Sequence, residues 1–110
     1  MCRQVVFHRY CGTMEKSIIV GGCRIVLQTE RSGAEHTKDN IDAYDMQGNH
    51  LWNISEAEGM SPDRYAFSDL WEEGIDMFSC CTYDGISFVM GTENPHIIRT
   101  KFPRSAIYMA

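Results

Sequence analysis

The sequence predicts a mainly antiparallel β domain with one short helix. Three observations lead to this fold class. Apolar runs rich in β-branched and aromatic residues recur along the chain, glycine-containing turns separate them at three places, and one segment shows helical spacing instead. With 110 residues, 44% of them hydrophobic and 23% charged, the chain has the size and composition of one globular domain, residues 1–110.

The first hairpin is expected to join residues 17–20 to 23–27 through Gly21-Gly22. A two-residue hairpin turn of this kind requires positive φ angles, which glycine accepts. Neither run alternates with polar residues, so both faces of this hairpin are expected to be covered. Because one helix cannot cover a whole sheet, we expect either two packed sheets or cover from another protein surface.

Two more hairpins and two flanking strands complete the predicted sheet. The second hairpin joins 41–45 to 51–54 through a turn containing Gly48-Asn49. The third joins 77–83 to 86–90 through Asp84-Gly85, a strong turn signal. The flanking strands are expected at 5–7 and 97–102. These antiparallel hairpins could form a blade-like meander, a compact sandwich or a barrel.

A short helix is predicted at 62–73. Ser61 is a good N-cap, Pro62 suits the first helical position, and Gly74 would end the helix. The apolar residues between them have the i, i+3, i+4 spacing of a helix face: Phe67, Leu70 and Trp71. The acidic residues of this segment would then lie on a solvated face.

Charge and hydropathy disfavour several classes of partner. The net charge is −5, and residues 56–76 contain seven acids against one base, Arg64. An acidic chain binds phosphate poorly, so nucleic acid is disfavoured. No apolar run approaches the length of a membrane span, and the first residues lack the apolar core of a secretory signal. These features predict a cytoplasmic protein without a membrane partner.

The five cysteines are predicted to be reduced thiols packed as small hydrophobic residues. They are Cys2, Cys11, Cys23, Cys80 and Cys81. An odd number without an export signal does not indicate a disulfide framework. A metal site is the alternative, and its candidate ligands are His8, Cys11 and Cys23, although no Cys-x-x-Cys spacing supports it. Adjacent Cys80 and Cys81 would point to opposite faces of a strand.

The sequence contains no nucleophile elbow, phosphate-binding loop or dinucleotide fingerprint, so no catalytic residue and no cofactor are predicted. Large aromatic rings dominate cores and interfaces, which makes them the expected packing or interface residues, with ligand stacking as the alternative. These residues are Trp52, Tyr65, Phe67, Trp71 and Phe88.

Residues 43–52, Ala-Tyr-Asp-Met-Gln-Gly-Asn-His-Leu-Trp, resemble the docking motif of quinoprotein-type β-propeller blades. The resemblance implies that Asp45 and Gly48 shape a turn and that Trp52 packs against a neighbouring blade. It implies architecture and no quinone cofactor, because a full ring is needed for that. A partial copy, Tyr83-Asp84, repeats Tyr44-Asp45 after 39 positions, near the period of blades.

These patterns favour a binding or assembly module over an enzyme. Its expected partner is a second copy of itself, because a hairpin that is apolar on both faces requires cover, and an unidentified protein or small ligand is the alternative. Two other hypotheses stay open. One is a small metal-dependent protein or enzyme that uses His8, Cys11 and Cys23, and the other is a barrel with a deep apolar pocket for a small ligand.

Overall fold

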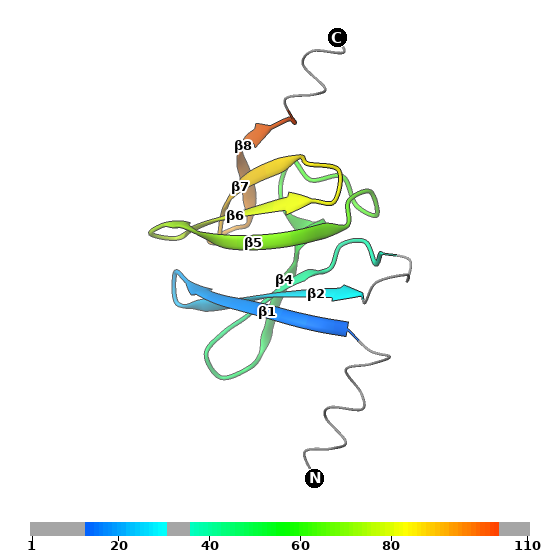
Figure 1. Ribbon diagram of the computed structural model, residues 1–110. Helices are drawn as coiled ribbons and strands as arrows, with labels where there is room; N and C mark the ends of the chain where they lie inside the picture. The colour runs from blue at the N-terminus through cyan, green and yellow to red at the C-terminus, as the bar shows by residue number, and fades with distance from the viewer. Residues whose placement is uncertain (1–12, 31–35, 104–110) are drawn as a thin grey trace.

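The computed structural model describes residues 13–30 and 36–103, which form two four-stranded antiparallel sheets packed face to face (Figure 1). The first sheet contains β1 (Thr13–Val20), β2 (Cys23–Glu30), β3 (Ile41–Tyr44) and β4 (His50–Asn53). A single 3-10 turn, η1 (Ile54–Glu56), follows it. The second sheet contains β5 (Phe67–Gly74), β6 (Met77–Thr82), β7 (Ser87–Gly91) and β8 (His96–Lys101). The prediction of a mainly β fold is confirmed, and the predicted strand at 5–7 lies outside the described residues.

Each sheet is a meander in which strands adjacent in the chain are also hydrogen-bonded neighbours. The three predicted hairpins are confirmed as β1–β2, β3–β4 and β6–β7. The glycines predicted for their turns adopt the expected left-handed conformation, with φ of 59° at Gly21, 78° at Gly22, 92° at Gly48 and 96° at Gly85.

The predicted helix at 62–73 is wrong, because this segment is a turn followed by β5. Asp63 has a φ of 58°, so the chain turns where a helix was expected to begin. In a regular strand, Phe67 and Leu70 would face opposite sides. A bulge at Ser68 brings both into the core, whereas Trp71 points away. A bulged strand therefore imitates the apolar spacing of a helix.

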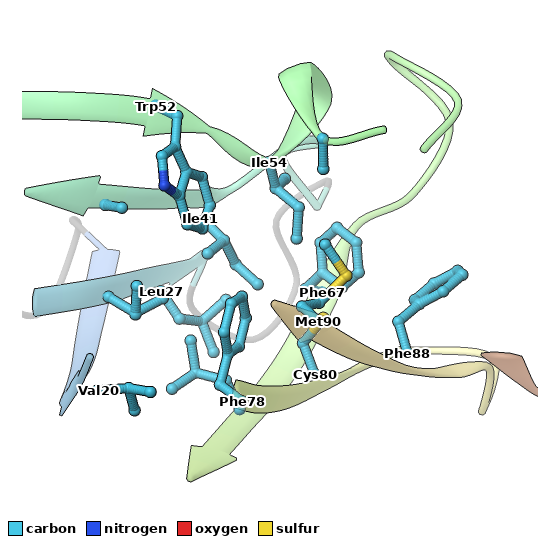
Figure 2. Close-up of a cluster of buried hydrophobic side chains, with 14 of the residues drawn as sticks. Val20, Leu27, Ile41, Trp52, Ile54, Phe67, Phe78, Cys80, Phe88 and Met90 are labelled. Carbon is cyan, nitrogen blue, oxygen red and sulfur yellow. The ribbon is translucent and has the colours of Figure 1, made fainter. Parts of the chain in front are cut away.

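The core lies between the two sheets (Figure 2). The first sheet contributes mainly aliphatic side chains: Ile25, Leu27, Ile41 and Ala43. The second contributes mainly aromatic and sulfur-containing ones: Phe67, Phe78, Cys80, Phe88 and Met90. Trp52 from β4 stacks on Phe78 from β6, with ring centroids 6.1 Å apart and an interplanar angle of 18°. The expectation of two packed sheets is therefore met.

Cover of the first hairpin differs between its two strands. On β2, Ile25 and Leu27 are buried in the core and Val26 on the opposite face is only 5% exposed, so both faces are covered. On β1, Ile18 packs against the core but Ile19 is 54% exposed. The expectation that both faces are covered is thus confirmed for β2 and wrong for β1.

The sheets are held together at both ends of β2. At one end, the Asn40 side chain donates to the carbonyl oxygens of Gln28 at 2.8 Å and Phe67 at 2.9 Å, and it accepts from the Phe67 N–H at 2.8 Å. At the other end, the two sheets approach closely: a Cβ atom on Gly21 would lie 2.5 Å from a carboxylate oxygen of Asp76, and the φ of 59° at Gly21 also favours glycine.

Candidate interaction surface

The two sheets share one structural plan. In both, the first hairpin has a two-residue turn, Gly21-Gly22 or Ile75-Asp76. In both, the third and fourth strands shift register at the same position, between Ala43 and Tyr44 in one sheet and between Val89 and Met90 in the other. The extra residue on the fourth strand is Leu51 or Ile98, and these are 48% and 46% exposed. The sheets are called repeats below because they share this strand order and this bulge, although β5 has two further bulges that β1 lacks.

The two repeats bury opposite faces of this shared plan. Counted from the hairpin turn, the third residue pair of the first sheet is Ile18–Ile25, which faces the core. The third pair of the second sheet is Trp71–Ser79, which faces away from it. The packing is consequently heterologous. In residues 13–30 and 36–103, no second sheet lies against the other face of either sheet.

The side of the first sheet that faces away from the second sheet, here called the first outer face, has the row Ile19, Arg24, Tyr44 and His50 across its four strands. The Arg24 guanidinium carbon lies 5.3 Å from the centre of the Tyr44 ring, and one of its nitrogens lies 3.7 Å from a carboxylate oxygen of Glu15. The rings of Tyr44 and His50 pack edge to face. The row is thus an ordered polar and aromatic surface.

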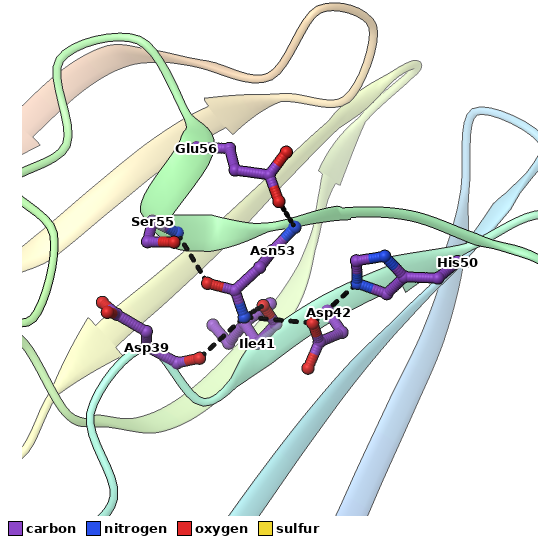
Figure 3. A network of polar contacts seen from close by, with 7 residues as sticks. All are labelled: Asp39, Ile41, Asp42, His50, Asn53, Ser55 and Glu56. Atoms are coloured by element: carbon purple, nitrogen blue, oxygen red, sulfur yellow. Dashed lines mark hydrogen bonds and ion pairs between the residues drawn. The ribbon is translucent and has the colours of Figure 1, made fainter.

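A hydrogen-bond network around Asn53 supports this face (Figure 3). The Asn53 amide donates to the carbonyl oxygens of Asp39 at 2.9 Å and Ile41 at 3.2 Å and to the Asp42 carboxylate at 3.0 Å. The same carboxylate lies 2.9 Å from His50 Nε2. Asp42 is therefore oriented from two sides on the first outer face.

Asn53 also caps the 3-10 turn that follows β4. Its side-chain oxygen accepts from the Ser55 N–H, and its own N–H donates to Glu56, so the pair forms a capping box (Figure 3). The backbone after β4 is thereby fixed to the edge of the first outer face.

The side of the second sheet that faces away from the first sheet, here called the second outer face, has the row Trp71, Ser79, Val89 and Arg99. Trp71 is 40% exposed, and the Ser79 hydroxyl donates to Glu73 at 2.5 Å. Arg99 is exposed, and no carboxylate of the described residues lies within 4.0 Å of it. Tryptophan and arginine are enriched where proteins bind one another.

The predicted packing residues separate into two groups. Trp52, Phe67 and Phe88 lie in the core with exposures of 6%, 0% and 3%, and Tyr65 packs at its margin. Trp71 alone lies on an outer face. The sequence pattern did not distinguish Trp71 from the other four, because the strand that carries it was expected to be a helix.

The cysteines of the described segments are packed thiols. Cys23 is buried and its sulfur donates to the Val20 carbonyl oxygen at 3.2 Å, and burial together with the Asp76 charge raises its pKa. Cys80 is buried, and burial strongly raises its pKa, whereas Cys81 on the opposite face is half-buried. Within residues 13–30 and 36–103, no three His, Cys, Asp or Glu side chains cluster as a metal site. The candidates His8 and Cys11 lie outside these residues.

Two open surface hollows are lined by both charged and uncharged residues. One, of about 600 Å³, lies at the β1–β2 and β5–β6 turns beside Ile19, Glu72 and Asp76. The other, of about 370 Å³, lies beside Lys38 and Arg64. Neither is the deep apolar pocket expected of a ligand-binding barrel.

The turn after β3 is organised by Asp45. Its carboxylate accepts from the N–H groups of Gln47 at 2.9 Å and Asn49 at 2.8 Å, and hydrogen bonding to Asn49 lowers the pKa of Asp45. The expected partial copy at Tyr83-Asp84 is not structurally equivalent, because it follows the second strand of its sheet rather than the third. The repeat is in the strands instead.

Comparison with protein-family models, with curated proteins and with solved structures gives no match. In the segments that the structure describes, no helix is long and apolar enough to cross a membrane. The geometry of the two outer faces is accordingly the main guide to function.

Proposed function

We propose that the protein is a non-enzymatic assembly module that associates with copies of itself through its two outer faces. The observation that carries the proposal is that, among the described residues, each sheet packs against the other sheet on one face only. The opposite faces each hold an exposed apolar side chain among polar ones, Ile19 on one and Trp71 on the other. Tryptophan and arginine, present together on the second outer face, are enriched at protein interfaces.

Side chains on the first outer face are held in fixed positions within the chain, which favours a role in binding. Arg24, Tyr44, His50 and Asp42 are already held in place by contacts within the chain. Side chains that are fixed before binding lose less conformational freedom in a complex, so binding costs less free energy. The resemblance of residues 43–52 to propeller blades gives further support, since Trp52 packs on the adjacent sheet as such a motif implies.

Sedimentation velocity of the full chain from about 1 to 100 μM tests the proposal. Homo-oligomeric interfaces commonly hold in this concentration range. We expect an oligomer, or a reversible shift from monomer to oligomer as concentration rises. A sedimentation coefficient that stays that of a monomer over the whole range would contradict self-association.

A further inference from the structure

We infer that the copies associate head to tail, with the second outer face of one copy packed on the first outer face of the next. This inference rests on the proposed self-association and specifies its geometry. Within one chain, the packed faces of the two repeats already form a heterologous interface. The second outer face corresponds in position to the packed face of the first sheet, and the first outer face corresponds to the packed face of the second sheet.

Counting residue pairs from the hairpin turns identifies the counterparts. Trp71 on the second outer face occupies the position that Ile18 has in the first sheet, and Ile18 packs against the core. Inside the chain, β1 lies against β5, and Lys16 forms an ion pair of 2.7 Å with Asp69 between these strands. The same arrangement between copies places Trp71 against the outer side of β1, where the small Ser17 precedes the exposed Ile19. A large ring would thus meet a small residue and an aliphatic one.

The same count places the charged residues of the two faces. Arg99 occupies the position that Trp52 has in the first sheet, because each pairs with the third-strand residue beside the bulge. Trp52 stacks on Phe78 of the facing sheet, and the counterpart of Phe78 on the first outer face is Arg24. Arg99 of one copy therefore lies over Arg24 of the next. The Glu15 carboxylate, 3.7 Å from Arg24, and the partly exposed Asp42 carboxylate offset the repulsion between the two guanidinium groups.

Head-to-tail association through different faces has a consequence for stoichiometry. Heterologous contacts continue until a ring closes, or they form an open filament if none closes. Rings of four-stranded meanders typically contain about four to eight sheets. With two sheets in each copy, a closed ring would contain about two to four copies.

A mixing experiment distinguishes this geometry from a symmetric one. Ile19→Asp blocks the first outer face and Trp71→Asp blocks the second, while each variant keeps the other face intact. We expect each purified variant to be a monomer at a concentration where the unmodified protein is assembled. An equimolar mixture should form one-to-one heterodimers, which native mass spectrometry identifies by their distinct masses.

The control is Met14→Asp, on the same strand as Ile19 and with a similar exposure of 56% against 54%, but on the other side of it. This variant should assemble like the unmodified protein. Should Trp71→Asp fold poorly by circular dichroism, Arg99→Asp blocks the same face at an exposed residue.

The outcomes separate the two proposals. If the unmodified protein is a monomer, the proposed function itself fails. If it assembles but Ile19→Asp or Trp71→Asp alone still forms the same oligomer, self-association stands and the head-to-tail geometry is overturned. If both variants are monomers and their mixture also stays monomeric, one shared symmetric surface explains the data and the inference is overturned as well.

Discussion

The two sheets have the same strand plan and use it in opposite ways. The first buries aliphatic side chains on the face that contains Ile25, and its outer face carries a polar row fixed by hydrogen bonds. The second buries three phenylalanines on the other face of the plan and leaves Trp71 outside. The backbone therefore does not decide which face is buried, because both choices occur on one plan within one chain. The alternation of side chains along each strand decides it.

The sharpest test of this comparison contrasts Phe78 with Trp71, which lie on opposite faces of the second sheet. Phe78→Ala should lower the free energy of unfolding by about 3 to 5 kcal/mol, because it removes a fully buried ring that stacks on Trp52. Trp71→Ala should lower it by about 1 kcal/mol or less, as expected for a partly exposed site.

Urea unfolding in the Ile19→Asp background makes this measurement, since self-association would otherwise add to the apparent stability of the folded state. Equal losses for the two variants would show that the second sheet does not have one hidden and one outer face.

A smaller effect is expected from the two asparagines that organise the structure. Asn40 connects the two sheets through three hydrogen bonds, so Asn40→Ala should cost about 1 to 3 kcal/mol by leaving the backbone of Phe67 unpaired in a buried place. Asn53 joins elements within the first sheet and is half-buried, so water can replace part of its bonding. We expect Asn53→Ala to cost about 1 kcal/mol.

Chemical denaturation of both variants tests which of them loses more stability. Hydrogen exchange at the Phe67 N–H reports directly on the hydrogen bond between Asn40 and Phe67. A larger loss for Asn53→Ala would mean that the first sheet depends more on its own network than on contact with the second.

The smallest effect concerns the ion pair that joins the edges of the sheets. The hydrogen bond from Lys16 lowers the pKa of Asp69 below its ordinary value of 3.8. A lowered folded-state pKa stabilises the fold above the ordinary value, and this contribution is lost as the pH falls through the folded-state pKa. Both side chains are about half exposed, so solvent screening limits the contribution to about 0.2 to 1 kcal/mol.

Lys16→Met should remove this part of the acid dependence while leaving the stability near pH 7 lower by no more than that amount. Thermal unfolding of the variant and the unmodified protein between about pH 2.5 and 7 measures the difference, a range that spans the ordinary aspartate pKa. An unchanged acid dependence would show that Asp69 gains nothing from Lys16.

The hairpins could be predicted from the sequence because their turns depend on local conformation. Gly21-Gly22 and Asp84-Gly85 need left-handed backbone whatever the rest of the chain does, and the adjacent runs are long enough to indicate strands. The β5–β6 hairpin was not predicted, because its turn lacks such a local signal. Its turn is Ile75-Asp76, and a non-glycine residue with a φ of 59° at Asp76 gives no such signal.

The outer faces could be predicted only in part. The two-sided apolar pattern of the first hairpin indicated that cover is needed, and Ile19 is the residue for which the chain does not supply it. The position of Trp71 depends on the bulge at Ser68. Because of this bulge, Phe67 and Leu70 share the core face and Trp71 lies on the opposite face. A bulge of this kind depends on pairing with β6, so local sequence does not reveal it.

The contact between Gly21 and the Asp76 turn limits the distance between the tips of the two sheets. A Cβ atom at position 21 would lie 2.5 Å from the Asp76 carboxylate, while the Asn40 side chain holds the sheets together at the other end of β2. A larger residue at position 21 would therefore push the tips apart, and the end held by Asn40 would stay in place.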